Sequence, residues 1–241
     1  MRNVFNFNYD DYQFQLFSLS HLLMIAISIF TIVILYISKD KFSLAAKRYF
    51  QYFLLILLFL SEASFQYWYI LNDKWDVAIN LPFQLCSLSL YLCMFMLITK
   101  SYRIFELTFF VSMTGAFVAM ITPELFFGFP HFRFFQFFMA HLVIIITCLY
   151  MLWIEKYQIT FHSLIRAFIG LNILAIGVFI LNKVLDSNYM FLIHKPVNPS
   201  LIDLLGPYPW YILSLELISF ILFLILYSPF YFKNKSKRFN N

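Results

Sequence analysis

The sequence has few charged residues. Of its 241 residues only 12% are Asp, Glu, Lys or Arg, whereas 62% are hydrophobic and 22% are aromatic. A soluble domain usually carries about a quarter charged residues, and a soluble core of this size could not enclose so much Phe, Leu and Ile. The composition therefore excludes an ordinary soluble protein and predicts an integral membrane protein.

Glycine, cysteine and histidine are too sparse to form several common sites. The five glycines include no phosphate-cradling loop, and the five histidines include no closely spaced pair of metal ligands. The three cysteines, Cys86, Cys93 and Cys148, lie in apolar runs without a CxxC motif, so we expect no disulfide. No basic soluble domain is present that could bind nucleic acid. We expect no metal, no cofactor and no nucleic-acid partner.

The apolar residues form runs of helical length. About 20 apolar residues span the hydrocarbon core, and helix is the default there because lipid satisfies no backbone polar group. The sequence predicts an all-α, polytopic transmembrane bundle that forms one domain over residues 1–241. About seven spans are predicted, at residues 19–37, 48–71, 81–98, 104–122, 134–154, 161–182 and 209–228. The acidic residues Asp10 and Asp11 before the first run argue against a cleaved signal peptide.

The basic residues predict the orientation of this bundle. Twelve of the 17 Lys and Arg residues lie at one end of the spans, in the connections after spans 1, 3 and 5 and in the C-terminal tail. Because cytoplasmic loops carry the excess of positive charge, the N-terminus is predicted outside and the C-terminus in the cytoplasm of a cell-membrane protein. In the long outer connection, "NPSLIDLLGPYPW" predicts a short helix capped by Ser200 and ended by Gly206.

Polar residues inside the spans are the candidates for a functional site, because placing them in lipid is costly. At a rise of about 1.5 Å per residue, Cys86, His141 and Glu216 lie roughly 7–11 Å below the outer boundary, with Gln84 and Glu62 nearby in depth. This shared depth predicts an outward-facing polar pocket. Glu106 lies at the opposite end, where a surface ion pair with Arg103 is expected.

Each of these residues also has a purely structural interpretation. A cysteine in a membrane helix is usually an inert filler, and a lone histidine usually bonds a neighbouring helix. Glu62 and Glu216 could lock helices together through hydrogen bonds. The functional alternative is that Cys86 is a nucleophile, His141 is its general base, and Glu62 or Glu216 orients the imidazole.

The stretch "PHFRFFQFFMAH" (130–141) divides into two parts. His131 and Arg133 are predicted at headgroup level, where with Lys195 they could pair with phosphate. His141 lies deeper, at the level of Cys86. Gln136 lies about 140° around the helix from His141, so we expect it to brace a neighbouring helix.

Three stretches carry a family resemblance: "LPFQLCSLSLYL" (81–92), "PHFRFFQFFMAH" (130–141) and "NYMFLIHKPVNPSLIDLLGPYPWYILSLE" (188–216). With these motifs the chain resembles the YwaF-like family of bacterial integral membrane proteins. That family resembles a eukaryotic multi-pass acyltransferase family that acts on ether-linked phospholipids. The resemblance implies a Cys–His catalytic pair, which falls on Cys86 and His141.

Two classes of function remain open at this point. One is a membrane-embedded lipid acyltransferase or acyl hydrolase, with membrane lipids as partners and a phospholipid or acyl chain as substrate. The other is non-enzymatic, either a small-molecule or proton-coupled transporter or a structural scaffold, in which Glu62 and Glu216 would be the important residues.

Overall fold

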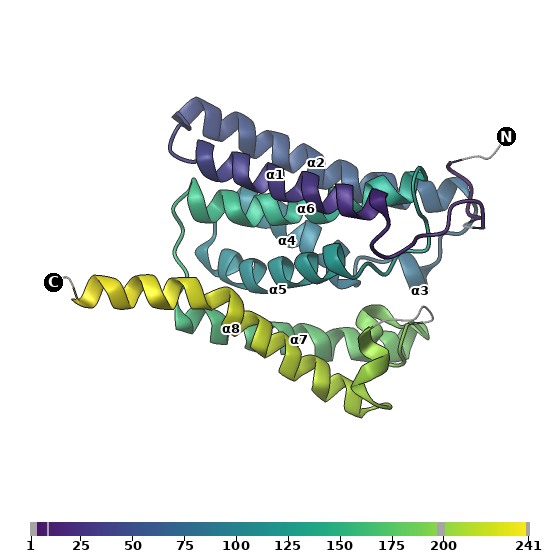
Figure 1. The fold of residues 1–241 in the computed structure, drawn as a ribbon. Coiled ribbons are helices and arrows are strands. Elements are labelled where there is room, and N and C mark those ends of the chain that lie inside the picture. The colour runs from purple at the N-terminus through teal and green to yellow at the C-terminus, as the bar shows by residue number, and fades with distance from the viewer. Residues whose placement is uncertain (1–3, 9, 197–200, 240–241) are drawn as a thin grey trace.

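The computed structural model describes residues 4–8, 10–196 and 201–239, the side chains of 201 and 233–239 excepted. This part of the chain is helical (Figure 1). The long helices are α1 (Leu19–Ser38), α2 (Leu44–Leu71), α4 (Leu85–Thr99), α5 (Tyr102–Ile121), α6 (Phe132–Trp153), α7 (Phe161–Leu185) and α8 (Trp210–Phe239). Three short helical turns accompany them: α3 (Val77–Asn80), η1 (Tyr189–Phe191) and η2 (Leu201–Leu205).

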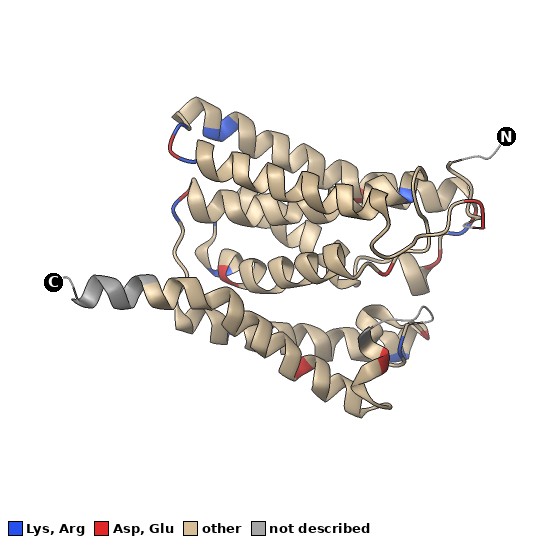
Figure 2. Cartoon of the chain, in the orientation of Figure 1, with Lys and Arg blue, Asp and Glu red and all other residues tan. Residues whose placement is uncertain are grey.

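These helices confirm the all-α membrane bundle. Six of the described helices are long and apolar enough to cross a membrane, and α4 is a shorter apolar helix, so a count of about seven spans fits. Charged residues lie mainly at the two ends of the bundle (Figure 2). The end formed by the connections before α4, before α6 and before α8 is called the outer end below, following the orientation that the basic residues predict.

The third span is shorter than the sequence predicts. The expected span began at residue 81, whereas α4 begins at Leu85 and its 15 residues rise only about 22 Å. Pro82 explains the difference, because a proline lacks the N–H of a helical bond and drives the residue before it into an extended conformation. Leu81 has that conformation, with ψ 151°. The first turn of α4 therefore starts below a non-helical linker (residues 81–84).

Helix α6 is the centre of the bundle. Within its apolar window 83% of the residues are buried, against 17% for α1 and 28% for α2. It contacts α1, α2, α4 and α5, while α7 and α8 pack beside α5 as a second layer (Figure 1). A polar side chain on α6 is therefore enclosed by other helices, which a sequence of uniform apolarity does not reveal.

Two predicted details of the loops and ends have different outcomes. The predicted short helix is the 3₁₀ helix η2, and Gly206 ends it in the left-handed region with φ +86°, as expected; Ser200 lies outside the described residues. The predicted ion pair of Glu106 with Arg103 is wrong. Glu106 is buried and accepts hydrogen bonds from Arg166 and Ser163 on α7, so it fastens α7 to α5.

The N-terminal segment, residues 4–8 and 10–18, is hydrogen-bonded to the outer end of α2 and to the connection before α6. The carbonyl of Phe5 accepts from Trp68 Nε1 (2.7 Å), and the carbonyl of Tyr12 accepts from the Gly128 N–H (2.6 Å). The Phe14 N–H donates to the Phe126 carbonyl (2.9 Å). These bonds join residues 63 or more positions apart in the chain.

We expect Gly128→Ala to detach this segment. An added Cβ would lie 2.5 Å from the carbonyl oxygen of Gln13, which is backbone and cannot rotate away. Forcing extra atoms into a packed site typically costs about 1–3 kcal/mol. Hydrogen exchange should accelerate across the N-terminal segment, and the melting temperature in detergent should fall.

Gly177→Ala is the matched control. Gly177 lies in α7 and a Cβ there would meet nothing within 4 Å. Alanine at a helical position is favoured over glycine, so this variant should melt at or slightly above the wild-type temperature. Unchanged exchange in the N-terminal segment of the Gly128→Ala protein would contradict the role given to its bonds.

Candidate functional site

Cys86 and His141 are in contact. Cys86 is the second residue of α4, and its Sγ lies 3.0 Å from Nε2 of His141 on α6. His141 is buried, at 3% exposure, whereas Cys86 is partly exposed. Cys86 is therefore the less enclosed residue of the pair.

A backbone carbonyl fixes the tautomer of His141. Its Nδ1 lies 2.7 Å from the carbonyl oxygen of Phe137, one turn earlier on α6. A carbonyl only accepts hydrogen bonds, so Nδ1 carries the proton and Nε2 presents a lone pair to the thiol. The sequence-based interpretation had a carboxylate, Glu62 or Glu216, in this orienting role. The structure gives the role to Phe137, because a helical histidine can reach the carbonyl four residues back without a partner helix.

Glu62 lies on α2 beside the pair. It is buried, its Oε1 accepts from Gln66 Nε2 (2.8 Å), and its carboxylate lies at the Ser87 hydroxyl next to Cys86. Gln66 also donates to the carbonyl of Asn80 (2.8 Å), so the same amide ties the carboxylate to the segment before α4. Glu62 thus connects α2 to the first turn of α4.

Arg133 supplies a positive charge near the thiol. Its guanidinium interacts electrostatically with Cys86 and Glu62, stacks 4.5 Å from the Phe65 ring and donates to Gln136. Gln136 in turn donates to the carbonyl of Ser61 (2.9 Å), so the predicted brace to a neighbouring helix is present and joins α6 to α2.

The backbone of α4 adds hydrogen-bond donors beside the sulfur. Gln84 occupies the N-cap position but makes no side-chain capping bond. The first N–H groups of a helix have no intrahelical acceptor, and the helix dipole leaves this end partially positive. Cys86 therefore lies among donors that favour a negative oxygen or sulfur.

Two residues predicted for the pocket form hydrogen bonds with the second layer of the bundle. The side-chain oxygen of Gln84 accepts from the Met190 N–H (3.1 Å), which engages it with the α7–α8 connection. Glu216 on α8 accepts from Asn172 on α7 (3.0 Å), and α8 packs against α5, α7 and η2. Equal depth did not bring Glu216 to the pair, because α7 and α8 form the second layer, whereas Gln84 lies at the N-cap of α4, two residues before Cys86.

The three predicted headgroup residues also separate. His131 is fully buried, so its side chain does not face lipid headgroups: it caps α6, its Nδ1 accepts from the Arg133 N–H and its Nε2 lies 2.9 Å from the carbonyl of Asn6. Burial lowers its pKa, in keeping with a neutral ring. Lys195 donates to the Asp203 carbonyl (3.2 Å) within its own connection. Of the three, Arg133 alone lies beside the Cys86–His141 pair.

Sequence reasoning missed several members of the site. Gln66 lies one helical turn after Glu62, and this spacing places two side chains on one face, so it could have been found. The Phe137 carbonyl and the Ser87 contact could not have been found, because they depend on which helices pack together.

The other two cysteines behave as packing residues: Cys93 and Cys148 are fully buried and lie beside one another.

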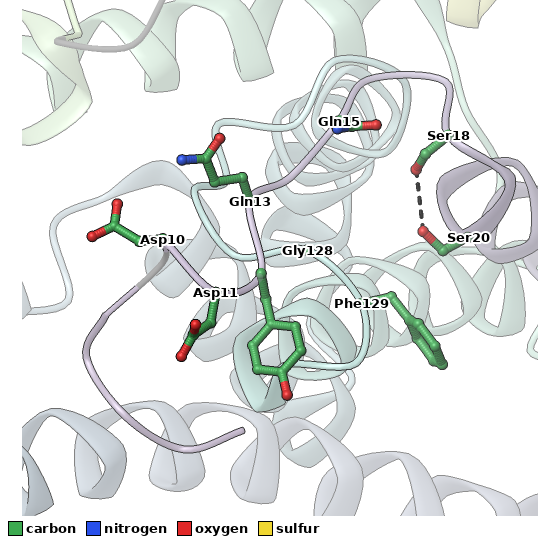
Figure 3. Close-up of a pocket in the computed structure, with 9 residues that line it drawn as sticks. Asp10, Asp11, Gln13, Gln15, Ser18, Ser20, Gly128 and Phe129 are labelled. Atoms are coloured by element: carbon green, nitrogen blue, oxygen red, sulfur yellow. Dashed lines mark hydrogen bonds between the residues drawn. The ribbon is translucent and has the colours of Figure 1, made fainter. Parts of the chain in front are cut away.

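The described residues show no metal cluster at the pair, and a groove at the N-terminal segment lies apart from it. In the described residues no group of three His, Cys, Asp or Glu side chains could hold a metal ion. A polar groove of about 560 Å³ opens at the N-terminal segment (Figure 3). Its lining residues are Asp10, Asp11, Tyr12, Gln13, Gln15, Ser18, Ser20, Gly128 and Phe129, and none belongs to the site above.

The arrangement has the parts of a thiol acyl-transfer site: a thiol, a neutral imidazole with its lone pair toward the thiol, and donors at a helix N-terminus.

Among known proteins, the family model described as the TMEM164 family matches residues 16–227. Comparisons with curated proteins and with solved structures gave no match.

Proposed function

The chain belongs to the TMEM164 family, a family of multi-pass membrane proteins, and from this premise and the Cys86–His141 contact we propose that it is a lipid acyltransferase of the cell membrane. The observation that carries the proposal is the 3.0 Å approach of Cys86 Sγ to a nitrogen of His141 whose partner nitrogen is occupied by the Phe137 carbonyl. The acyltransferase resemblance of the 81–92 and 130–141 motifs supports the same chemistry.

The first half-reaction forms a thioester. Cys86 Sγ attacks the carbonyl carbon of a lipid ester while His141 Nε2 takes the thiol proton. The tetrahedral intermediate then expels the alcohol oxygen, which receives that proton from Nε2, and the acyl group remains on sulfur. The imidazole is neutral again at the end of this step.

The second half-reaction reverses the roles. The hydroxyl of an acceptor lipid gives its proton to His141 Nε2 as its oxygen attacks the thioester carbon. The thiolate of Cys86 leaves and recovers the proton. If water takes the place of the acceptor lipid, the same residues hydrolyse the acyl group, so transferase and hydrolase differ only in the acceptor.

The first turn of α4 would stabilise the oxygen that becomes negative in both steps. Backbone N–H groups aimed at such an oxygen act in a low-dielectric site, and one such donor is typically worth about 10²–10³ in rate. The positive charge of Arg133 acts in the same direction, and it is the predicted headgroup residue that remains at the site. The position of Cys86 near the outer end lets the lipid ester reach it without leaving the membrane.

Trapping the thioester tests the proposal. The purified protein in lipid nanodiscs is incubated with a phospholipid that carries an alkyne-tagged acyl chain, and each cysteine-containing peptide is analysed by mass spectrometry. We expect the acyl mass on Cys86, absent from Cys93 and Cys148, and released by hydroxylamine. Cys86→Ala is the control. A wild-type protein that never carries acyl on Cys86 would exclude the proposed function.

A further inference from the structure

A buried amide holds the start of the α7–α8 connection. Asn182, in the last turn of α7, is 1% exposed. Its Nδ2 donates to the Tyr189 carbonyl (2.9 Å), and its Oδ1 accepts from the Tyr189 N–H (2.8 Å) and from the Ser187 hydroxyl (2.9 Å). Both polar groups of the Tyr189 main chain are fixed in this way, so the direction of its side chain is fixed as well.

Tyr189 reaches from this connection to the segment that precedes α4. The residue is fully buried, and its hydroxyl accepts from the Leu81 N–H (3.0 Å) and donates to the Val77 carbonyl (2.5 Å). Its ring packs edge-on against Phe83 at 5.7 Å. Burial raises the pKa of the hydroxyl, so it keeps the proton that it donates.

A second bond reaches the N-cap of α4. The Met190 N–H donates to Oε1 of Gln84, two residues before Cys86. Met190 and the next residue, Phe191, both have left-handed backbone, with φ 57° and 54°. Non-glycine residues keep this strained conformation only where surrounding contacts determine it, and such strain concentrates at functional sites.

His141 is fixed independently, on the central helix α6 and by its own carbonyl partner. The distance between Sγ and Nε2 therefore depends on where the first turn of α4 lies. Pro82 interrupts the helix before that turn, so the turn depends on outside contacts. We infer that Tyr189 is a positioning residue, which holds Cys86 at the distance from His141 that proton transfer requires. The inference rests on the proposed function.

Alkylation of Cys86 as a function of pH tests the inference without any lipid substrate. The protein in nanodiscs reacts with iodoacetamide, and mass spectrometry follows the Cys86 peptide. In Tyr189→Phe the ring remains but the bonds to Leu81 and Val77 are lost. Because misplacing a group by about 1 Å can cost about 100-fold, we expect the rate at pH 7 to fall roughly tenfold or more, with a changed pH profile.

Tyr211→Phe is the matched control. Tyr211 is also fully buried and its hydroxyl also bonds this connection, at the Phe191 carbonyl (2.6 Å), but it does not reach the α3–α4 linker. We expect its rate and pH profile to match the wild type. Gln84→Met removes the hydrogen bond from the Met190 N–H and should shift the pH profile of alkylation in the same direction as Tyr189→Phe. It serves as a second variant if Tyr189→Phe does not fold.

The outcomes separate the two proposals. If His141→Ala slows the alkylation of Cys86 whereas Tyr189→Phe and Gln84→Met behave as the wild type, Tyr189 does not position the thiol and the Cys–His pair stands. If His141→Ala leaves the rate and its pH profile unchanged, the proposed function itself fails. Equal losses in Tyr189→Phe and Tyr211→Phe would show a general packing role and would also overturn the inference.

Discussion

His141→Ala should slow the acylation of Cys86 by about 10²–10⁴-fold, the range in which a positioned general base contributes. Alanine removes the imidazole nitrogen that faces the thiol and takes its proton during attack. The thiol is then the nucleophile only to the extent that it ionises unaided. Rapid-quench measurement of thioester formation with the tagged phospholipid gives the rate for each variant.

His21→Ala is the matched control for that measurement. His21 is another buried histidine near the outer end, but its ring nitrogens bond only main-chain groups, the Met120 carbonyl at 2.9 Å and the Phe17 N–H at 3.1 Å, and its ring packs against phenylalanine side chains. Its loss should lower the melting temperature and leave the acylation rate of folded protein within a few-fold. If both histidine variants acylate at the same rate, proton transfer by His141 is excluded.

The depth of a residue was predictable from the sequence, whereas its direction around the helix axis was not. Counting from the ends of the apolar runs placed Cys86 and His141 at one level, and the structure has them in contact. The same counting placed Glu216 at that level, yet it faces Asn172 on α7. Which helices are neighbours depends on side-chain packing over the whole bundle, and uniform apolar runs carry little of that information.

Long-range contacts account for the other errors. His131 has the sequence context of a headgroup anchor because it lies between a proline and an arginine at a helix start. Its partner is the carbonyl of Asn6, 125 residues away, so it is buried instead. Glu106 has Arg103 one turn away, but the bundle brings Arg166 to it from α7. In both cases a nearby residue in the sequence suggested a partner, and packing supplied another.

Glu62→Leu should destabilise the protein by on the order of 3 kcal/mol, because it removes the acceptor of buried donors and a carboxylate that interacts with Arg133. The amide nitrogen of Gln66 would keep only the Asn80 carbonyl as an acceptor, and the Ser87 hydroxyl would lose the carboxylate on α2. Thermal unfolding in detergent measures the loss. Glu216→Leu is the control: its carboxylate also lies in a span, and its loss should affect stability without changing the acylation rate.

Glu62→Gln separates a structural role from a role in proton movement. Glutamine keeps an oxygen that can accept from Gln66 and Ser87, so the first turn of α4 should stay in place, the melting temperature should remain near that of the wild type, and acylation should stay within roughly tenfold. If the protein were instead a proton-coupled transporter, Glu62→Gln would abolish its activity, because the amide cannot carry a proton. The protein would then remain folded, and a pH-driven uptake present in wild-type proteoliposomes would disappear. A folded Glu62→Gln protein that acylates Cys86 at nearly the wild-type rate identifies Glu62 as a brace between α2 and α4, beside a reaction carried out by Cys86 and His141.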